Sequence, residues 1–303
     1  MHLKYKSFKE IILSVILGFF IGLSIIIPGL SGSIVAMAMK IYDKLLYSFA
    51  NILKKFKSCF IFLIPIGIGA VVGFGVGLIL VKLLLDKFPF QTICFFVGLM
   101  IGAYPIIHEE IKGKEINVKR ILLYSIGIII PICLSLLALN GGSNDLSNLE
   151  LHNYLIFVVI GALIALTQIM PGLSATALLM VCGYYTVLME SIGFDLLNNF
   201  DIILVFVALL LGCGIGILAF SKVINRMLEK HKISFYFLIC GLAVGSIISI
   251  FIGPDCIEIY KAWSNSNIIL ILASSIICLI CGFIITYFMV LYEKKHKNIE
   301  GKE

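Results

Sequence analysis

Apolar residues fall in long blocks along this chain, and short polar connections separate them. The blocks cover roughly residues 11–27, 59–85, 90–107, 120–139, 153–170, 202–221, 233–252 and 267–291. Most have about the 20 residues that a helix needs to cross the hydrocarbon core of a bilayer. None shows the period-two alternation of apolar and polar residues that is typical of a membrane β-strand. The pattern predicts an all-α polytopic membrane protein.

Composition and charge agree with this prediction. The chain has 303 residues, of which 61% are hydrophobic and 13% charged, and a mean hydropathy of +1.12. A soluble domain of this length would need more charged residues on its exterior. The net charge of +6 comes from lysines and arginines in the connections, as the positive-inside rule requires. We therefore expect a bilayer around the protein and no nucleic-acid partner.

The nine cysteines give no sign of a metal or redox centre. Nearly all lie inside apolar blocks, where we expect them to pack as small apolar side chains. Cys278 and Cys281 form a CxxC pair, but no second pair or nearby histidine accompanies them. Lys4, Lys6 and Lys9 precede the first block without a following cleavage site, so we expect this block to be retained. No cofactor is expected.

The tetrapeptide PGLS occurs twice inside apolar blocks. It covers residues 28–31 and 171–174, so the two copies lie 143 positions apart. The same shift aligns Tyr42 with Tyr185 and several glycines with one another. The sequence therefore contains a diverged internal repeat.

The repeat divides the chain at a polar linker. Residues 140–153 contain no lysine or arginine and are rich in Asn, Gly and Ser, which favours a boundary there. We expect a first repeat at 1–144 and a second at 145–303 within one membrane domain. The segment GFGVG at 73–77 matches GCGIG at 212–216 at an offset of 139, which suggests that the second copy is four residues shorter at this point.

Basic residues predict which connections face the cytoplasm. Lysine and arginine concentrate in residues 1–10, 51–58, 108–120 and 222–232 and in the C-terminal tail, whereas 140–153 and 186–201 contain none. Basic connections lie on the cytoplasmic side of a cell membrane. We therefore expect both termini to be cytoplasmic.

This distribution also predicts two hairpins. Residues 11–50 start and end on the cytoplasmic side, and residues 153–190 start and end outside. Three crossing helices follow each hairpin, and this odd number inverts the second repeat relative to the first, as in many secondary transporters. Charge counting leaves both re-entrant loops and full crossings open. We favour re-entrant hairpins, because Lys40, Asp43 and Lys44 would otherwise lie within the lipid-spanning zone.

The PGLS turns have the chemistry of an anion site. Proline ends the first arm of each hairpin, glycine permits a tight turn, and serine or threonine can cap a helix that starts there. A helix start presents free N–H groups to an anion such as phosphate. A kink that eases helix packing is the alternative. The candidate substrate-binding residues are Pro28, Gly29, Ser31, Gly32, Ser33, Lys40, Tyr42, Gln168, Pro171, Gly172, Ser174, Thr176 and Tyr185.

These turns and the Tyr42–Asp43 pair that follows the first of them resemble the PopT-type polyprenyl-phosphate transporters. The resemblance covers nearly the whole chain. It implies a flippase that returns undecaprenyl phosphate, the lipid carrier of cell-envelope synthesis, to the cytoplasmic leaflet. It also implies that residues 28–33 and 171–176 lie next to the substrate. The chain has Ile25, Ser33 and Lys40 where that family typically has an acidic residue and two glycines.

The turns also resemble those of the integral-membrane undecaprenyl-pyrophosphate phosphatases. Such an enzyme needs a nucleophile and a cation on the leaving phosphate, which that family supplies with an arginine after the serine. Here Gly32 and Ala175 take that position, and Arg120 and Arg226, the only arginines, lie in connections. We therefore expect a transporter without catalytic residues. Transport of another anionic lipid or small anion, and coupling to a proton or sodium ion, stay open.

Overall fold

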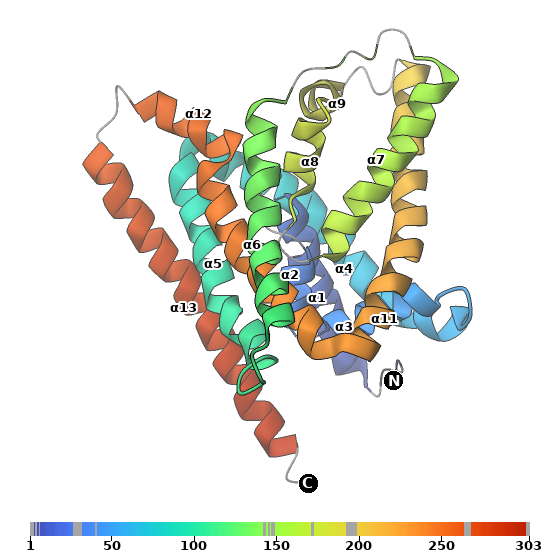
Figure 1. Cartoon of the computed structure of the whole chain (residues 1–303), viewed down its shortest axis with the longest axis vertical. Coiled ribbons are helices and arrows are strands. Elements are labelled where there is room, and N and C mark those ends of the chain that lie inside the picture. The colour runs from blue at the N-terminus through green and yellow to red at the C-terminus, as the bar shows by residue number, and fades with distance from the viewer. Residues whose placement is uncertain are drawn as a thin grey trace.

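The computed structural model describes the chain except residues 1–2, 4, 6, 27–31, 40, 142–143, 145, 147–148, 171–172, 192–198, 264–267 and 301–303. All regular structure in the described ranges is helical (Figure 1). The helices up to the polar linker are α1 (Phe8–Ile26), α2 (Gly32–Ala38), α3 (Tyr42–Asn51), α4 (Phe56–Lys87), α5 (Pro89–Glu109) and α6 (Val118–Leu139). Those after it are α7 (Leu151–Ile169), α8 (Ala175–Val181), α9 (Tyr185–Ser191), α11 (Phe200–Ile252), α12 (Pro254–Ala262) and α13 (Ile268–Glu300).

Seven helical segments of the described chain are long and apolar enough to cross a membrane. One of them covers α11 and α12 over 63 residues, which is far more than a single crossing needs. The backbone of α11 leaves the helical conformation at His231, with φ −135° and ψ 39°. The break divides α11 into an arm at 200–230 and an arm at 232–252, each of crossing length. The predicted all-α, multi-pass architecture is therefore confirmed.

Glycines bring α1 against α4 and α7 against α11 at backbone distance. A Cβ atom added at Gly18 would lie 2.0 Å from the carbonyl oxygen of Ile66, and one added at Gly161 would lie 2.2 Å from that of Leu209. Only glycine permits such close approach of two helices. Both the glycines and their partners are 143 positions apart, so the two helix pairs use the same contact.

The next contact along these helices corrects one alignment. An added Cβ at Gly69 would meet the Val15 carbonyl oxygen at 1.9 Å, and one at Gly212 would meet that of Val158 at 2.0 Å. The offset is again 143, so the expected offset of 139 for the segment 73–77 is wrong. Gly69, Gly73 and Gly77 are four residues apart, so an alignment shifted by four residues still matches glycine with glycine. The sequence alone therefore does not distinguish an offset of 139 from one of 143.

Each half ends in a helix that packs against the other half: α6 packs against α11, and α13 packs against α5. An added Cβ at Gly98 in α5 would lie 2.1 Å from the Leu279 carbonyl oxygen in α13, and one at Gly241 in α11 would lie 2.1 Å from that of Tyr124 in α6. The glycines are 143 positions apart, but their partners are 155 apart. The 12 additional residues lie between α11 and α13, where α12 is inserted.

Figure 1 shows the two short-helix segments at opposite ends of the bundle. Helix α3 lies at the lower end, where α1 begins and α11 breaks, whereas α9 lies at the upper end above α8. The largest cluster of buried apolar side chains lies at the lower end and includes Leu46, Phe235 and Ile239. The upper end has a separate, smaller cluster around Phe157 and Val205.

Candidate functional site

The second PGLS turn leads directly into α8, and Ser174 is the N-cap of that helix. Its Oγ accepts a hydrogen bond from the backbone N–H of Ala177 at 3.2 Å and shares a hydrogen bond of 2.7 Å with Thr176 Oγ1. The sequence predicted capping at this position because serine is among the preferred N-cap residues. The two hydroxyls are thereby held side by side at the start of α8.

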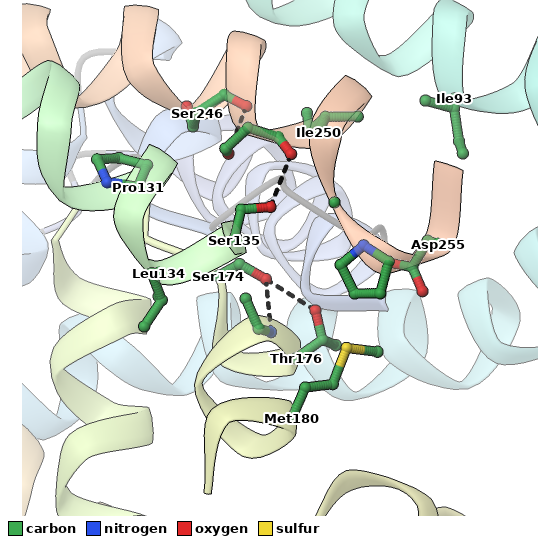
Figure 2. Close-up of a pocket in the computed structure, with 14 residues that line it drawn as sticks. Ile93, Pro131, Leu134, Ser135, Ser174, Thr176, Met180, Ser246, Ile250 and Asp255 are labelled. Carbon is green, nitrogen blue, oxygen red and sulfur yellow. Dashed lines mark hydrogen bonds between the residues drawn. The ribbon is translucent and has the colours of Figure 1, made fainter. Parts of the chain in front are cut away.

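Both hydroxyls line a small cavity of about 40 Å³ between α8, α6 and α11 (Figure 2). The facing wall contributes three more hydroxyl groups, from Ser135 on α6 and from Ser246 and Ser249 on α11, among apolar side chains such as Leu134 and Ile250. Five hydroxyl side chains from three helices therefore surround one space inside an apolar bundle.

The serines of the facing wall donate hydrogen bonds to helix carbonyl groups. Ser135 Oγ donates to the Ser249 carbonyl oxygen at 2.9 Å, and Ser246 Oγ donates to that of Ala243 at 3.0 Å. Ser249 Oγ donates to the Ser246 carbonyl oxygen at 2.9 Å. A hydroxyl hydrogen rotates to suit its partner, so each of these groups can donate to an anionic oxygen instead. The cavity can thus solvate an anion without a fixed positive charge.

The cavity adjoins a larger groove of about 550 Å³ that opens beside α12. Ile93 and Asp255 line both spaces, so Asp255 stands where they meet. Charged and polar side chains of the groove are Lys87, Gln91, Tyr185, Asp255 and Glu258. The groove and the hydroxyl-lined cavity are therefore neighbours, with Ile93 and Asp255 between them.

Aromatic rings form one side of the groove. Phe90 contacts Tyr260 and Trp263 with ring centroids 5.8 Å and 4.9 Å apart, and the last two rings are 5.1 Å apart. Tyr185 lies in the groove rather than in the cavity. Burial, together with the charges of Asp255 and Glu258, raises the pKa of the Tyr185 hydroxyl, which therefore stays protonated at neutral pH.

Tyr42, the residue that matches Tyr185, is buried. Its hydroxyl donates to the carbonyl oxygen of Ile169, the last residue of α7, at 3.0 Å. This bond joins the first hairpin to the tip of the second. Burial raises the pKa of Tyr42, so the hydroxyl remains a donor. The two equivalent tyrosines therefore differ, because one is bonded in a closed core and the other lines an open groove.

We expect Tyr42→Phe to destabilise the protein by about 1–3 kcal/mol, since it leaves a buried carbonyl group without its donor. Tyr185→Phe is the matched control and should change stability little, because no hydrogen bond of the described structure involves its hydroxyl. Thermal unfolding in detergent would measure both. Equal losses from the two variants would contradict the assigned role of the Tyr42–Ile169 bond.

A polar cluster lies near Tyr42. Burial raises the pKa of Asp43, while the Lys232 ammonium and the nearby Tyr236 hydroxyl oppose this shift. Lys232 Nζ in turn lies 2.8 Å from Glu110 Oε2 and over the Tyr236 ring. The cluster connects α3, α5 and the break of α11 at the end of the bundle opposite the groove.

The remaining predicted residues do not share one space. Gly32 lies against Ile21 of α1, and Ser33 is buried. Gln168 Oε1 is buried and has no hydrogen-bond partner in the described part of the chain. The structure thus unites Ser174 with Thr176 but places the other described residues elsewhere. The predicted residues Pro28, Gly29, Ser31, Lys40, Pro171 and Gly172 lie outside the described residues.

Sequence reasoning missed the opposite wall of the cavity. Ser135, Ser246, Ser249 and Asp255 come from helices far from PGLS in the chain. One signal was present: Ser246 and Ser249 stand three residues apart in an apolar helix and so share one face. The proximity of this face to PGLS depends on tertiary packing.

Comparison with known proteins identifies the family of this chain. The model of the undecaprenyl phosphate translocase-like family matches residues 21–268. The "Polyprenyl-phosphate transporter" of Staphylococcus aureus strain NCTC 8325 is 30% identical over 285 residues, covering 93% of this chain and 96% of that protein. The protein of the same name from Vibrio cholerae serotype O1 is 27% identical over 246 residues, covering 76% and 74%. No solved structure matches. With a family model over most of its length and a relative aligned nearly end to end, the chain belongs to the undecaprenyl phosphate translocase-like family.

Proposed function

We propose that this protein transports polyprenyl phosphate across the cell membrane by passing the phosphate head group through the Ser174 cavity. The observation that carries the proposal is a space lined by five hydroxyl groups inside an apolar bundle. The names of the relatives, both polyprenyl-phosphate transporters, agree with this substrate.

The physical need for such a site is clear. An ionised phosphate that enters hydrocarbon loses its hydration, at a cost far above that of a neutral polar group. Hydroxyl donors at Ser174, Thr176 and the facing serines would replace part of that hydration. The prenyl tail needs no cavity, since it can remain in the lipid around exposed apolar side chains such as Val71, Leu210 and Ile269.

The predicted halves at 1–144 and 145–303 would form inverted repeats. Their equivalent glycine contacts support this proposal, as does the exchange of α6 and α13 between the halves. Figure 1 adds that α4 starts at the lower end of the bundle and α11 at the upper end. Inverted repeats place the substrate between the halves and let one rock against the other.

We further propose that both hairpins are re-entrant. Their returning arms are broken into short helices, of seven and ten residues for α2 and α3 and of seven each for α8 and α9. None of these approaches the length of about 20 residues that a crossing helix needs. Broken helices at membrane depth are tolerated where protein covers them or a cavity adjoins them.

Transport would run from the outer to the cytoplasmic leaflet and would recycle the carrier for cell-envelope synthesis. In this structure the groove is open at the end bearing α12, while buried apolar side chains around Leu46 and Phe235 close the other end. The first residues of α1 and the last turn of α13 both lie at that lower end in Figure 1. The basic connections support the proposal that this end faces the cytoplasm.

The cavity lining favours transport of the phosphate over its hydrolysis. Its described lining contains no arginine or lysine that could stabilise a leaving phosphate. The direct test uses purified protein in lipid vesicles with a fluorescent short-chain prenyl phosphate. Movement between leaflets faster than in protein-free vesicles is the expected result. Phosphate release from a prenyl pyrophosphate, without lipid movement, would replace the proposal by a phosphatase.

Labelling of single cysteines would test the inverted arrangement. We expect Lys54→Cys, in the α3–α4 turn, to react with an impermeant thiol reagent only from the cytoplasmic side. Asn199→Cys, at the equivalent start of α11, should react only from outside. Both positions are exposed, and the nine native cysteines would first be replaced. Reaction of the two positions from the same side would show that the halves are not inverted.

A further inference from the structure

Asp255 places a carboxyl group between the groove and the cavity. It lies in the first turn of α12 and lines both the groove and the Ser174 cavity (Figure 2). Within the described part of the chain it makes no hydrogen bond or ion pair. A phosphate that moves from the groove to Ser174 would therefore come close to this carboxyl group.

The groups around Asp255 offer little positive charge. Helix α12 contributes Glu258 and α9 contributes Tyr185, while α5 contributes the neutral Gln91. Helices α6 and α11 contribute hydroxyl and apolar groups to the cavity. Lys87, at the end of α4, is the only cation of the groove lining and forms no ion pair there within the described residues. One lysine thus faces two acidic side chains.

The substrate adds more negative charge at this point. A phosphate monoester carries a charge of about −1.5 to −2 near pH 7. Beside an ionised carboxylate, this charge would be repelled strongly in a confined space, and the carboxyl group would then favour its protonated form. A protonated carboxyl group also gains an O–H donor for a phosphate oxygen. A proton on Asp255 therefore removes a repulsion and adds a hydrogen bond.

We propose that Asp255 takes up one proton from the groove when the phosphate enters and releases it on the cytoplasmic side with the lipid, so that transport is coupled to proton entry. This inference rests on the proposed function. The proton moves from external water to the Asp255 carboxylate, and then to cytoplasmic water after the halves have rocked. The free carboxylate returns to the groove and can accept the next proton.

The test uses the full chain in vesicles that contain a pH-sensitive dye, with a fluorescent short-chain prenyl phosphate added outside. For the natural sequence we expect lipid movement, acidification of the interior that depends on the lipid, and faster movement under an inward proton gradient. Asp255→Asn should lose the acidification and the response to the gradient. Asp86→Asn, which changes an exposed carboxylate at the same end of the bundle, is the control and should keep both.

Each outcome has a distinct meaning. Asp255→Glu, which keeps the carboxyl group, should retain acidification, and lipid movement that persists in Asp255→Asn without a gradient would show that this variant is folded. Acidification that persists in Asp255→Asn, or lipid movement driven by a sodium gradient and not by a proton gradient, would overturn the inference and leave the transport proposal standing. Absence of lipid movement by the natural sequence under every gradient would overturn both.

Discussion

Ser174→Leu is expected to abolish movement of polyprenyl phosphate. The cavity at Ser174 has only about 40 Å³ of free space, and a leucine side chain would occupy it and displace the facing serines. The substitution also removes the hydroxyl that caps α8, at a cost of about 1 kcal/mol. Lipid movement in vesicles should fall to the rate of protein-free vesicles, while thermal unfolding should show that the variant remains folded.

Two further variants distinguish the effect of side-chain volume at position 174 from the effect of losing its hydroxyl group. Ser174→Ala keeps the space but removes the hydroxyl, so transport should be reduced without being abolished. Ser58→Leu makes the same change as Ser174→Leu at an exposed position near the start of α4 and should leave transport unchanged. Full transport by Ser174→Leu would contradict passage of the head group through this cavity, whatever the behaviour of the other two.

The spans could be predicted from the sequence because they depend on local properties. A helix in lipid needs a certain length of apolar residues, and this requirement is visible in the chain without knowledge of its neighbours. The break at His231 falls between two predicted apolar blocks, where the polar connection 222–232 stands. The insertion of α12 was not predicted, because the connection at 253–266 has no strong helical pattern and the helix is short.

The sequence predicted the wall of the cavity that contains Ser174 and Thr176, but not the opposite wall. Ser174 and Thr176 follow a conspicuous turn, and capping by Ser174 is a local consequence of its position. Ser135 and Ser249 meet across the cavity only because α6 packs against α11 of the other half, and glycines at Gly127 and Gly241 permit this packing. No pattern within one helix records which helix it will face.

Tertiary packing also explains why the two equivalent tyrosines have different environments. A repeat predicts equal environments for Tyr42 and Tyr185, yet one is bonded to Ile169 and the other lines the groove. In a transporter built from inverted repeats, a structure open to one side must break the equivalence of the halves. The inequality therefore agrees with a groove that is open while the opposite end is closed. We expect the environments to exchange when the groove closes.

Gly161→Leu is expected to destabilise the protein by about 3 kcal/mol or to prevent folding, because even a Cβ atom at this position would lie 2.2 Å from the Leu209 carbonyl oxygen. The obstacle is backbone, which cannot rotate away as a side chain can. Helix α7 would have to separate from α11, and the tip of α7 carries the carbonyl group that Tyr42 binds. Thermal unfolding in detergent and the yield of monodisperse protein would measure the effect.

Gly214→Leu is the matched control, since it makes the same change on α11 at a glycine with no neighbouring atom within 4 Å. In a helix interior, leucine is favoured over glycine by about 0.5–1 kcal/mol, so this variant should be as stable as the natural sequence or slightly more stable. Gly18→Leu, at the equivalent contact of α1 with α4, should be as harmful as Gly161→Leu, because its Cβ would lie 2.0 Å from the Ile66 carbonyl oxygen. Equal tolerance of leucine at positions 18, 161 and 214 would show that the helices do not approach one another so closely. The repeated contact would then no longer support two equivalent halves.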